Sequence, residues 1–261
     1  MTLSAIIIAK NEEKRIKYCL KSVAFADEVI TVIDRSSTDN TALLAQEAGA
    51  MVLFEDWQGY GHQKNKGAAA ASGDWLLFVD ADEEVTQDLA AEIHAIIQHP
   101  QYNVYWLKII TIFLGTSLRH LYGHNPRLFR RGAARWTDSY VHEQVVTVEG
   151  QLVQLQDHLS GILTVPLLHN SYSTVTAYLQ KMHRYTSLDA EQMYRMHTHR
   201  SGRPVQPSIL LPVTLALRQW VKLVFYRQGF LDGWAGFMWS TLSAYYEFEM
   251  ARKFLALARN K

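Results

Sequence analysis

Aspartate residues stand at the ends of two apolar segments in the first third of this chain. Asp34 closes the segment 29–34, and Asp80 closes 75–80, with Asp82 two residues further on. Two carboxylates at positions i and i+2 beyond a strand can face one site when the chain turns there. Oxygen ligands of this kind favour Mg²⁺ or Mn²⁺. Asp80 and Asp82 are therefore the candidate metal ligands, and Asp34 is suited to accept hydrogen bonds from a base or a ribose.

These acidic residues need a scaffold that brings strand ends together. Four apolar runs, rich in β-branched residues and bounded by polar residues or glycine, alternate with segments of helical periodicity. The pattern predicts an α/β fold with a mainly parallel sheet and helices on both faces. The first helix is expected to start after Asn11, as its N-cap. The expected strands are 3–9, 29–34, 51–54 and 75–80.

Parallel strands place their carboxyl ends at one edge of the sheet, where ligands of such folds bind. Asp34, Asp80 and Asp82 should therefore converge at that edge. Their carboxylates would repel one another without a counter-charge, so we expect a cation or a donor-rich ligand between them.

Four segments of the chain resemble glycosyltransferase family two: 9–12, 34–39, 63–67 and 73–83. The resemblance implies the GT-A fold, a Rossmann-like nucleotide domain with a metal-binding Asp-x-Asp. It implies that Ala9, Asn11 and Asp34 line a uracil and ribose pocket. It further implies that Lys64 and Asn65 lie beside the diphosphate, with Asp80 near the ribose and Asp82 on the metal. The nucleotide-sugar residues expected within these segments are Ala9, Asn11, Glu12, Asp34, Lys64, Asn65, Asp80 and Ala81.

Further segments resemble, more narrowly, the bacterial lipopolysaccharide inner-core β-1,4-glucosyltransferases: 57–61, 126–131, 141–143 and 229–233. This resemblance implies transfer of glucose from UDP-glucose to a heptose of a lipid-linked saccharide acceptor. One departure is Arg35-Ser36, where relatives commonly carry Ser-Gly. The loss of glycine restricts φ at that turn, and Arg35 adds bulk near the expected base pocket.

An inverting transfer needs a general base on the acceptor hydroxyl, and a carboxylate within hydrogen-bond reach can serve. The candidates are Glu143, which the family resemblance favours, and Asp138, because spacing alone does not choose between them. Arg127 and Arg130 are candidates to neutralise the departing diphosphate or to bind acceptor phosphates, since a guanidinium binds phosphate with two hydrogen bonds.

The last third of the chain differs in charge and periodicity. Residues 174–261 hold 12 Lys and Arg against 5 Asp and Glu, and they read as helical segments around 174–200, 208–227 and 233–257. We expect two domains, a GT-A nucleotide-sugar and acceptor domain at 1–170 and a helical region at 171–261. The charge-free, aromatic stretch 233–246 is too short to span a bilayer. It suits either a helix pair lying on a membrane surface or a buried helical subdomain.

The expected protein is thus a cytoplasmic glycosyltransferase, placed on the inner face of the cytoplasmic membrane if the helices bind lipid. The single cysteine, Cys19, excludes an internal disulfide and fits a reducing compartment. The acidic body around the site argues against nucleic acid as a partner. Other hypotheses stay open: a family-two enzyme with another donor or with a protein or glycan acceptor, or a nucleotide-binding module without catalysis.

Overall fold

The computed structural model describes residues 1–138, 143–172 and 174–259. Its chain falls into two compact units: residues 1–110 with 123–170, and residues 111–122 with 171–261. The roles expected for the two domains, 1–170 and 171–261, stay predictions. Structurally, the short segment 111–122 belongs with the helices of the second unit.

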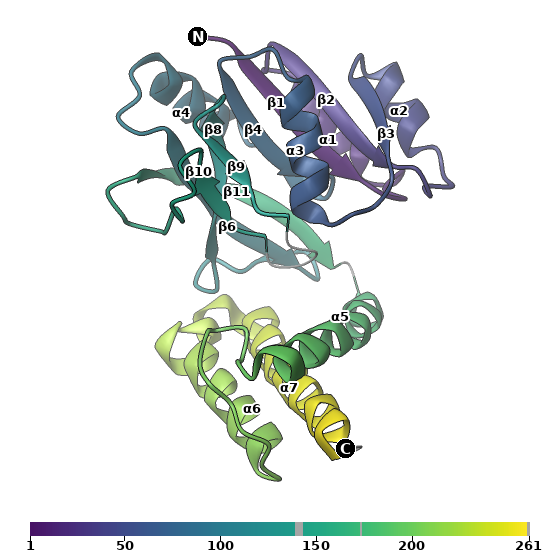
Figure 1. The fold of residues 1–261 in the computed structure, drawn as a ribbon, viewed down its shortest axis with the longest axis vertical. Coiled ribbons are helices and arrows are strands. Elements are labelled where there is room, and N and C mark those ends of the chain that lie inside the picture. Colours follow the sequence, from purple (N-terminus) through teal and green to yellow (C-terminus); the bar gives the residue numbers. More distant parts are fainter. Residues whose placement is uncertain (139–142, 173, 260–261) are drawn as a thin grey trace. The chain divides into compact units, whose positions relative to one another are not determined.

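The elements of the first unit alternate as the sequence predicts (Figure 1). β6 and β11 run on into the second unit. The strands are β1 Leu3–Ala9, β2 Glu28–Asp34, β3 Met51–Glu55, β4 Trp75–Asp80, β5 Glu83–Glu84, β6 Val104–Phe113, β8 Gly123–Arg130, β9 Ala134–Trp136, β10 Val145–Thr147 and β11 Ser160–Tyr172. The helices are α1 Ile16–Ser22, α2 Thr41–Glu47, α3 Tyr60–Ala70 and α4 Gln87–Gln98.

The described strands form one large sheet in the order β3-β2-β1-β4-β8-β6-β11-β5. The strands β3, β2, β1 and β4 are parallel, and β8 joins β4 in the antiparallel direction. The predicted α/β fold with a mainly parallel sheet and helices on both faces is confirmed. A separate two-stranded sheet pairs β9 with β10.

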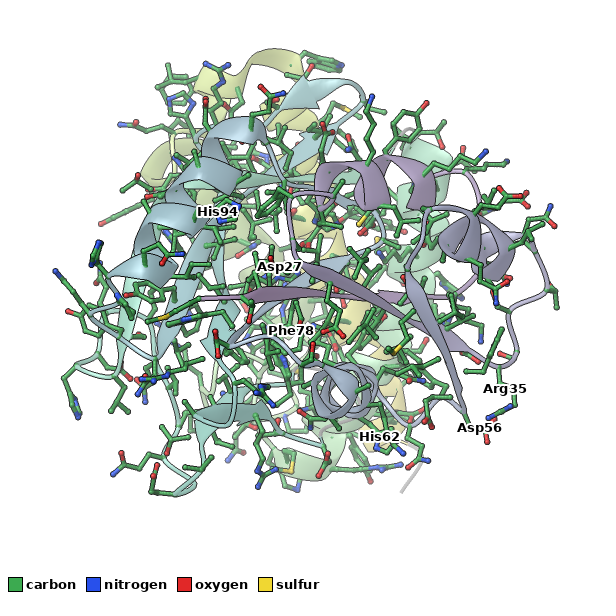
Figure 2. All side chains as sticks on the ribbon, turned by 90° about the horizontal axis from the view of Figure 1, so that it is seen from above. Asp27, Arg35, Asp56, His62, Phe78 and His94 are labelled. Carbon is green, nitrogen blue, oxygen red and sulfur yellow. The ribbon has the colours of Figure 1, made fainter. Side chains whose placement is uncertain are left out.

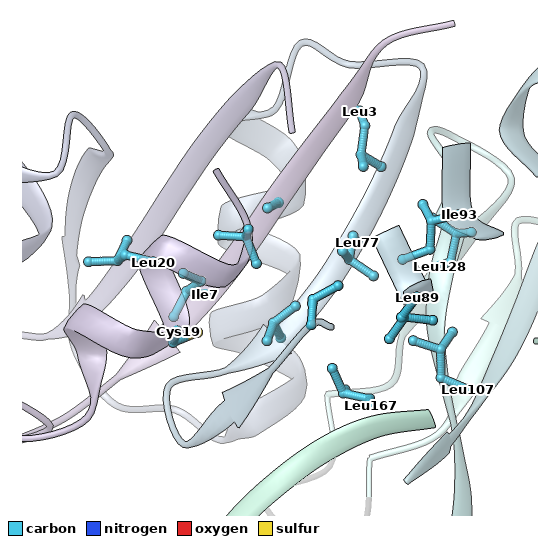
Figure 3. Close-up of a cluster of buried hydrophobic side chains, with 14 of the residues drawn as sticks. Leu3, Ile7, Cys19, Leu20, Leu77, Leu89, Ile93, Leu107, Leu128 and Leu167 are labelled. Carbon is cyan, nitrogen blue, oxygen red and sulfur yellow. The ribbon is translucent and has the colours of Figure 1, made fainter. Parts of the chain in front are cut away.

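Side chains of β1 alternate between two buried clusters, which explains why the whole strand is apolar. Leu3 and Ile7 face one cluster, together with Leu20 of α1 and Ile93 of α4, as Figure 3 shows. Ile6 and Ile8 belong to the cluster on the other face of the sheet, where α3 packs. Helices therefore cover both faces, as expected.

One helix start differs from expectation. Asn11 does not cap α1, which begins at Ile16 after Arg15 and has no side-chain cap. Asn11 instead adopts φ of 54° in the preceding turn, and its side-chain oxygen accepts a hydrogen bond from the Thr38 backbone N–H at 2.8 Å. The hydrogen bond between the two loops therefore outweighs the preference of Asn11 for an N-cap position.

The second unit consists of β7 Thr116–Ser117, α5 Val175–Met196, α6 Leu211–Val221, the π-helical turn η1 Lys222–Tyr226, the 3-10 turn η2 Gly229–Asp232 and α7 Gly233–Arg259. The helical character expected of this region is confirmed. The side of α7 around Met250 and Phe254 packs with residues of α5 and α6. No helix among the described residues is both long and apolar enough to span a bilayer.

A buried carboxylate fixes the connection between α5 and α6. Glu247 of α7 is almost fully buried and accepts hydrogen bonds from His199 at 2.9 Å and from Arg200 at 2.5 Å. Burial alone would raise the pKa of Glu247, but these two partners outweigh it, and the pKa lies below its ordinary value of 4.5. Glu247 thus stabilises the folded unit in its ionised form.

Close packing of α3 on the sheet predicts a position intolerant of size. A Cβ at Gly67 would lie 2.4 Å from Cγ2 of Ile6. We expect Gly67→Leu to lower the free energy of unfolding by about 1–3 kcal/mol, because overpacking outweighs the gain in helix propensity. Urea unfolding measures this. Ala69→Leu, at an exposed position of the same helix, is the control, and equal stability of both variants would contradict the packing.

Glu247 predicts a pH-dependent stability. Because its folded pKa is depressed, its contribution is complete above the unfolded value near 4.5 and is lost as the pH falls through the lower folded pKa. Glu247→Gln should therefore destabilise the protein at neutral pH, and the difference from the wild type should shrink towards acid pH. Thermal unfolding followed across pH measures that difference. A difference that stays constant would contradict the assigned ionisation.

Candidate active site

The register of three parallel strands brings the predicted acidic residues to one edge of the sheet. Ile8 of β1 pairs with Val32 of β2 on one side and with Asp80 of β4 on the other. Asp34 ends β2 at this same edge. The turn after β4 carries Asp82, with the buried Ala81 between the two aspartates.

Arg127 of β8 is the buried cation beside these carboxylates. Its guanidinium nitrogen lies 2.7 Å from Oδ2 of Asp80 and 2.6 Å from Oε1 of Glu83, and only 3% of Arg127 is exposed. Glu83 also accepts the Asp80 backbone N–H at 2.8 Å. The counter-charge expected at this edge is therefore supplied by the chain itself.

The two carboxylates beside Arg127 have opposite pKa shifts. For Asp80, burial would raise the pKa, but the positive charges of Arg127 and Lys64 outweigh it and hold the pKa well below its usual range. For Glu83, burial dominates over the attraction of Arg127, and the negative charge of Asp80 adds to it, so the pKa rises to about 7. Asp80 is consequently the ionised partner of Arg127 at neutral pH.

Lys64 of α3 links Asp80 to the candidate base Glu143. Its Nζ lies 2.7 Å from Oε1 of Glu143 and 3.9 Å from Oδ1 of Asp80. The ammonium also lies 4.3 Å from the centre of the Trp136 ring. Lys64 is buried although it is charged, which is tolerated because anionic and aromatic partners surround it.

The segment that carries Glu143 packs closely on the start of α3. The backbone N–H of Thr137 donates to the carbonyl of Gln144 at 2.8 Å, which closes the loop between them. A Cβ at Gly61 would lie 2.0 Å from the Thr137 carbonyl oxygen and 3.3 Å from Cβ of Glu143. Glycine at this position thus lets Glu143 approach Lys64. Val141 and His142, part of the family-like segment, lie outside the described residues.

Asp82 faces a histidine that the sequence did not single out. Nε2 of His169, on β11, lies 3.2 Å from Oδ2 of Asp82. The backbone of the same segment fixes Asp82, because the N–H of Asn170 donates to the Asp82 carbonyl at 2.8 Å. Burial would lower the pKa of His169, but the hydrogen bond and the charge of Asp82 raise it. Arg15 of the first turn lies 3.9 Å from the same carboxylate oxygen.

The expected base-binding residues form a second group around Asp34. Lys10 pairs with Oδ2 of Asp34 at 2.9 Å, and the Ser36 backbone N–H donates to Oδ1 at 2.8 Å. Ala9 is buried at the end of β1. Asn11 is held by Ser37 and Thr38, as described above.

Arg35 is directed away from Asp34. Its guanidinium lies 3.3 Å from Asp56 and donates to the Phe54 carbonyl at 2.9 Å, and Figure 2 shows Arg35 and Asp56 together at the edge of the molecule. Neither Arg35 nor Ser36 has a positive φ. The turn is therefore made without the glycine that relatives carry, and the arginine does not fill the space beside Asp34.

Four other predicted residues lie apart from this cluster or have structural partners. Arg130 is exposed and pairs with Trp75 at the start of β4, the end opposite to Asp80, because β8 runs antiparallel to β4. Asn65 uses both side-chain amide groups on the backbone of Trp136, at 2.9 and 3.0 Å. Asp138 is exposed. Glu12 lies 3.5 Å from Arg15.

Asp80 and Asp82 offer a partial site for a hard divalent cation. No group of three or more His, Cys, Asp or Glu side chains among residues 1–138, 143–172 and 174–259 is arranged as a preformed metal site. However, Oδ1 of Asp80 is buried and accepts no hydrogen bond from the described part of the chain. One or two carboxylates completed by water and phosphate oxygens are what Mg²⁺ commonly uses, so the residues fit an ion that arrives with a nucleotide.

Sequence reasoning missed Glu83 and His169 as members of this cluster. Glu83 follows Asp82 directly, and its place in the acidic run at 80–83 was the available sequence signal. His169 lies in an ordinary strand pattern, and only the pairing of β11 with β5 brings it to Asp82. No local sequence signal predicts that pairing.

The buried ion pair predicts a large effect of removing its cation. We expect Arg127→Met to lower the free energy of unfolding by about 3–5 kcal/mol, because it leaves buried carboxylates without a partner. The double variant Arg127→Met with Glu83→Gln should recover part of this loss. Urea unfolding measures both. Arg130→Met, on the exposed end of the same strand, is the matched control, and a similar loss there would contradict the assignment.

Comparison with known proteins identifies the family of this chain. The sequence profile of glycosyl transferase family 2 matches residues 4–151. An uncharacterized glycosyltransferase of Rickettsia bellii is 30% identical over 258 residues, 94% of this chain and 83% of the relative. The lipopolysaccharide core biosynthesis glycosyltransferase LpsC of Rhizobium meliloti is 28% identical, over 94% of this chain and 91% of LpsC.

A solved structure shares the fold. The crystal structure of TarS from S. aureus has a TM-score of 0.50 and 16% identity, covering 93% of this chain and 55% of TarS. The family profile covers more than half of the chain and includes Lys64 and the three aspartates Asp34, Asp80 and Asp82. The chain belongs to glycosyl transferase family 2 and is a glycosyltransferase.

Proposed function

We propose that this glycosyltransferase moves glucose from UDP-glucose onto a heptose of the lipopolysaccharide inner core, with inversion at the sugar. Two lines of support favour this donor and acceptor. The chain resembles inner-core β-1,4-glucosyltransferases in segments spread from residue 57 to residue 233. Its relative LpsC, which is named for lipopolysaccharide core biosynthesis, aligns over 94% of the chain.

The observation that carries the catalytic proposal is the ammonium of Lys64, shared between Glu143 and Asp80. We assign Glu143 as the general base, with Asp138 as the second candidate. The ammonium lies 2.7 Å from Oε1 of Glu143 and fixes the position of a carboxylate, a group that can accept a proton from an acceptor hydroxyl. A diphosphate bound beside Lys64 would compete for the ammonium and leave Glu143 to accept the proton of the acceptor hydroxyl.

We assign the donor site to the edge formed by β1, β2 and β4. Asp34 is proposed to accept hydrogen bonds from the base or the ribose, with Ala9 and Asn11 beside it and Asp80 near the sugar. Arg127 is held by two carboxylates, so its role is to orient Asp80. Asn65 and Arg130 have lesser support, since Asn65 binds the Trp136 backbone and Arg130 lies at the opposite end of the sheet.

We propose that Mg²⁺ or Mn²⁺ is held by Asp82, with Asp80 next to it. The exposed fraction of the Asp82 side chain is 13%, so an ion can reach it together with a nucleotide. Bound there, the ion would offset the negative charge that develops on the departing diphosphate. His169 and Arg15 orient the Asp82 carboxylate from two sides.

We place the enzyme in the cytoplasm, on the inner face of the cytoplasmic membrane, because a lipid-linked acceptor is presented there. Surface attachment would keep the enzyme close to that acceptor. The excess of basic residues in 174–261 supports this placement.

Removing the base tests the mechanism. We expect Glu143→Gln to lower kcat by about 10²–10⁴-fold with little change in KM for the donor, because only proton transfer is lost. Release of UDP in the presence of core-truncated lipopolysaccharide measures turnover. Glu149→Gln, at an exposed position nearby, is the control. A normal kcat for Glu143→Gln together with a large loss for Asp138→Asn would transfer the role to Asp138.

Asp82→Ala with a donor screen tests the function itself. We expect turnover with UDP-glucose and Mg²⁺ or Mn²⁺, and almost none after the substitution, because the carboxylate that holds the ion is lost. A different result would indicate a non-catalytic module: the wild type turns over no UDP-, GDP- or ADP-sugar, and Asp82→Ala only binds nucleotide more weakly. Transfer to a protein but not to lipopolysaccharide would overturn the acceptor.

A further inference from the structure

The outer face of α6 is an exposed apolar stripe. Val213, Leu217, Val221 and Phe225 follow one another at intervals of four residues, so they lie along one side of the helix and of the η1 turn that continues it. All four side chains are exposed, with 59% exposure at both Leu217 and Phe225. A soluble helix normally carries polar residues on this face.

The opposite face of α6 packs into the core of the helical unit. The exposed stripe is therefore a second apolar face of this helix. Leu211 and Leu215 pack against the cluster formed by Met193, Met250 and Phe254. The helix is thus apolar on two faces, and only one of them is covered within its own unit. An apolar surface of this kind marks an interaction site.

Exposed aromatic residues extend the stripe past the end of α6. Tyr226 is 88% exposed and Trp234 is 71% exposed. Ring contacts join these elements, because Trp220 of α6 lies 5.8 Å from Phe225 and 6.2 Å from Phe237 of α7. The lipid-facing surface, as we call it below, comprises Val213, Leu217, Val221, Phe225, Tyr226 and Trp234. Tyrosine and tryptophan are the side chains that favour the boundary between lipid headgroups and acyl chains.

The charge around this surface selects the kind of partner. Residues 192–231 contain no Asp or Glu, but they contain six Lys and Arg. Arg218 and Lys222, both exposed, follow Leu217 and Val221 directly and therefore flank the stripe. Two copies of such a surface would repel each other, whereas an anionic surface would be attracted.

We propose that α6, η1, η2 and the start of α7 lie flat on an anionic lipid bilayer, with the lipid-facing surface in the headgroup region. Apolar side chains would enter the boundary layer while Arg218 and Lys222 contact lipid phosphates. This specifies the membrane attachment suggested under the proposed function, and it requires no donor or acceptor sugar.

The sequence directed attention to 233–246, and the structure moves the surface to α6. Ala235, Gly236, Ser240 and Ala244 are buried within the helical unit. Lys253 of α7 is basic but donates hydrogen bonds within the unit, to the His183 carbonyl and to Thr186 and Ser187. Large exposed apolar side chains lie on α6, on the two turns after it and at Trp234 of α7.

Vesicle flotation with the full chain tests the proposal. We expect the wild type to float with vesicles of phosphatidylethanolamine and phosphatidylglycerol and to stay behind with phosphatidylcholine alone. Arg218→Gln and Lys222→Gln should each weaken binding about fivefold, because each basic residue near an anionic surface contributes about that factor. Leu217→Asp should weaken it at least about tenfold, through lost burial and added repulsion.

Leu43→Asp is the matched control, because Leu43 on α2 is a similarly exposed leucine in the first unit. It should float as the wild type does. Thermal unfolding of every variant separates loss of binding from loss of fold. Flotation that is equal with neutral vesicles, or unchanged by Arg218→Gln, Lys222→Gln and Leu217→Asp alike, would overturn the proposal. The proposal would also be overturned if the wild type bound no vesicles but formed a dimer, and if Leu217→Asp were monomeric.

A transfer assay with the same variant separates this inference from the proposed chemistry. Leu217→Asp should keep the turnover of UDP-glucose with a detergent-dispersed acceptor while losing transfer to an acceptor embedded in vesicles. A wild type that binds anionic vesicles but transfers no sugar would leave the lipid-facing surface intact and remove the proposed function.

Discussion

The site depends on how negative charge is compensated at one edge of a parallel sheet. Strand ends gather carboxylates there, and Coulomb repulsion in a partly buried place would oppose folding without nearby cations. Arg127 meets this need from the opposite side of β4, through contacts to Asp80 and Glu83. The antiparallel strand β8 thus contributes a buried guanidinium to this edge of the sheet. The electrostatic constraint is met within the chain, before any ligand arrives.

Compensation of this kind also prepares the chemistry. Lys64 is shared by two carboxylates, so its pairing can shift when another anion approaches. By contrast, Arg127 donates from Nη2 to both Asp80 and Glu83 and holds these two carboxylates together. Under the proposed function, Arg127 would position Asp80 while Lys64 would respond to the diphosphate. Electrostatic preorganisation of this type is a large part of enzymatic catalysis.

The helical unit follows a different logic. Its inner surfaces are closed by ordinary apolar packing and by the buried Glu247, which ties the connection at His199 and Arg200 to α7. Its outer surface on α6 is apolar without cover and basic at its flank. Folding alone does not require the second feature, since exposing leucine and phenylalanine to water stabilises nothing. A partner surface gives these residues a physical reason.

The sequence by itself determined the strand–helix alternation, the placement of Asp34, Asp80 and Asp82 at strand ends, and the helical last third. These features are local, because periodicity and strand boundaries are written within a few residues. Only the tertiary structure decided that Arg127 faces the carboxylates while Arg130 does not, that Glu143 meets Lys64, and that His169 meets Asp82. Those pairings join residues 47, 79 and 87 positions apart, and they depend on strand pairing and on the packing of α3, which no local sequence pattern specifies. The Asn11 cap failed for the same reason, since a contact between loops outweighed a local preference.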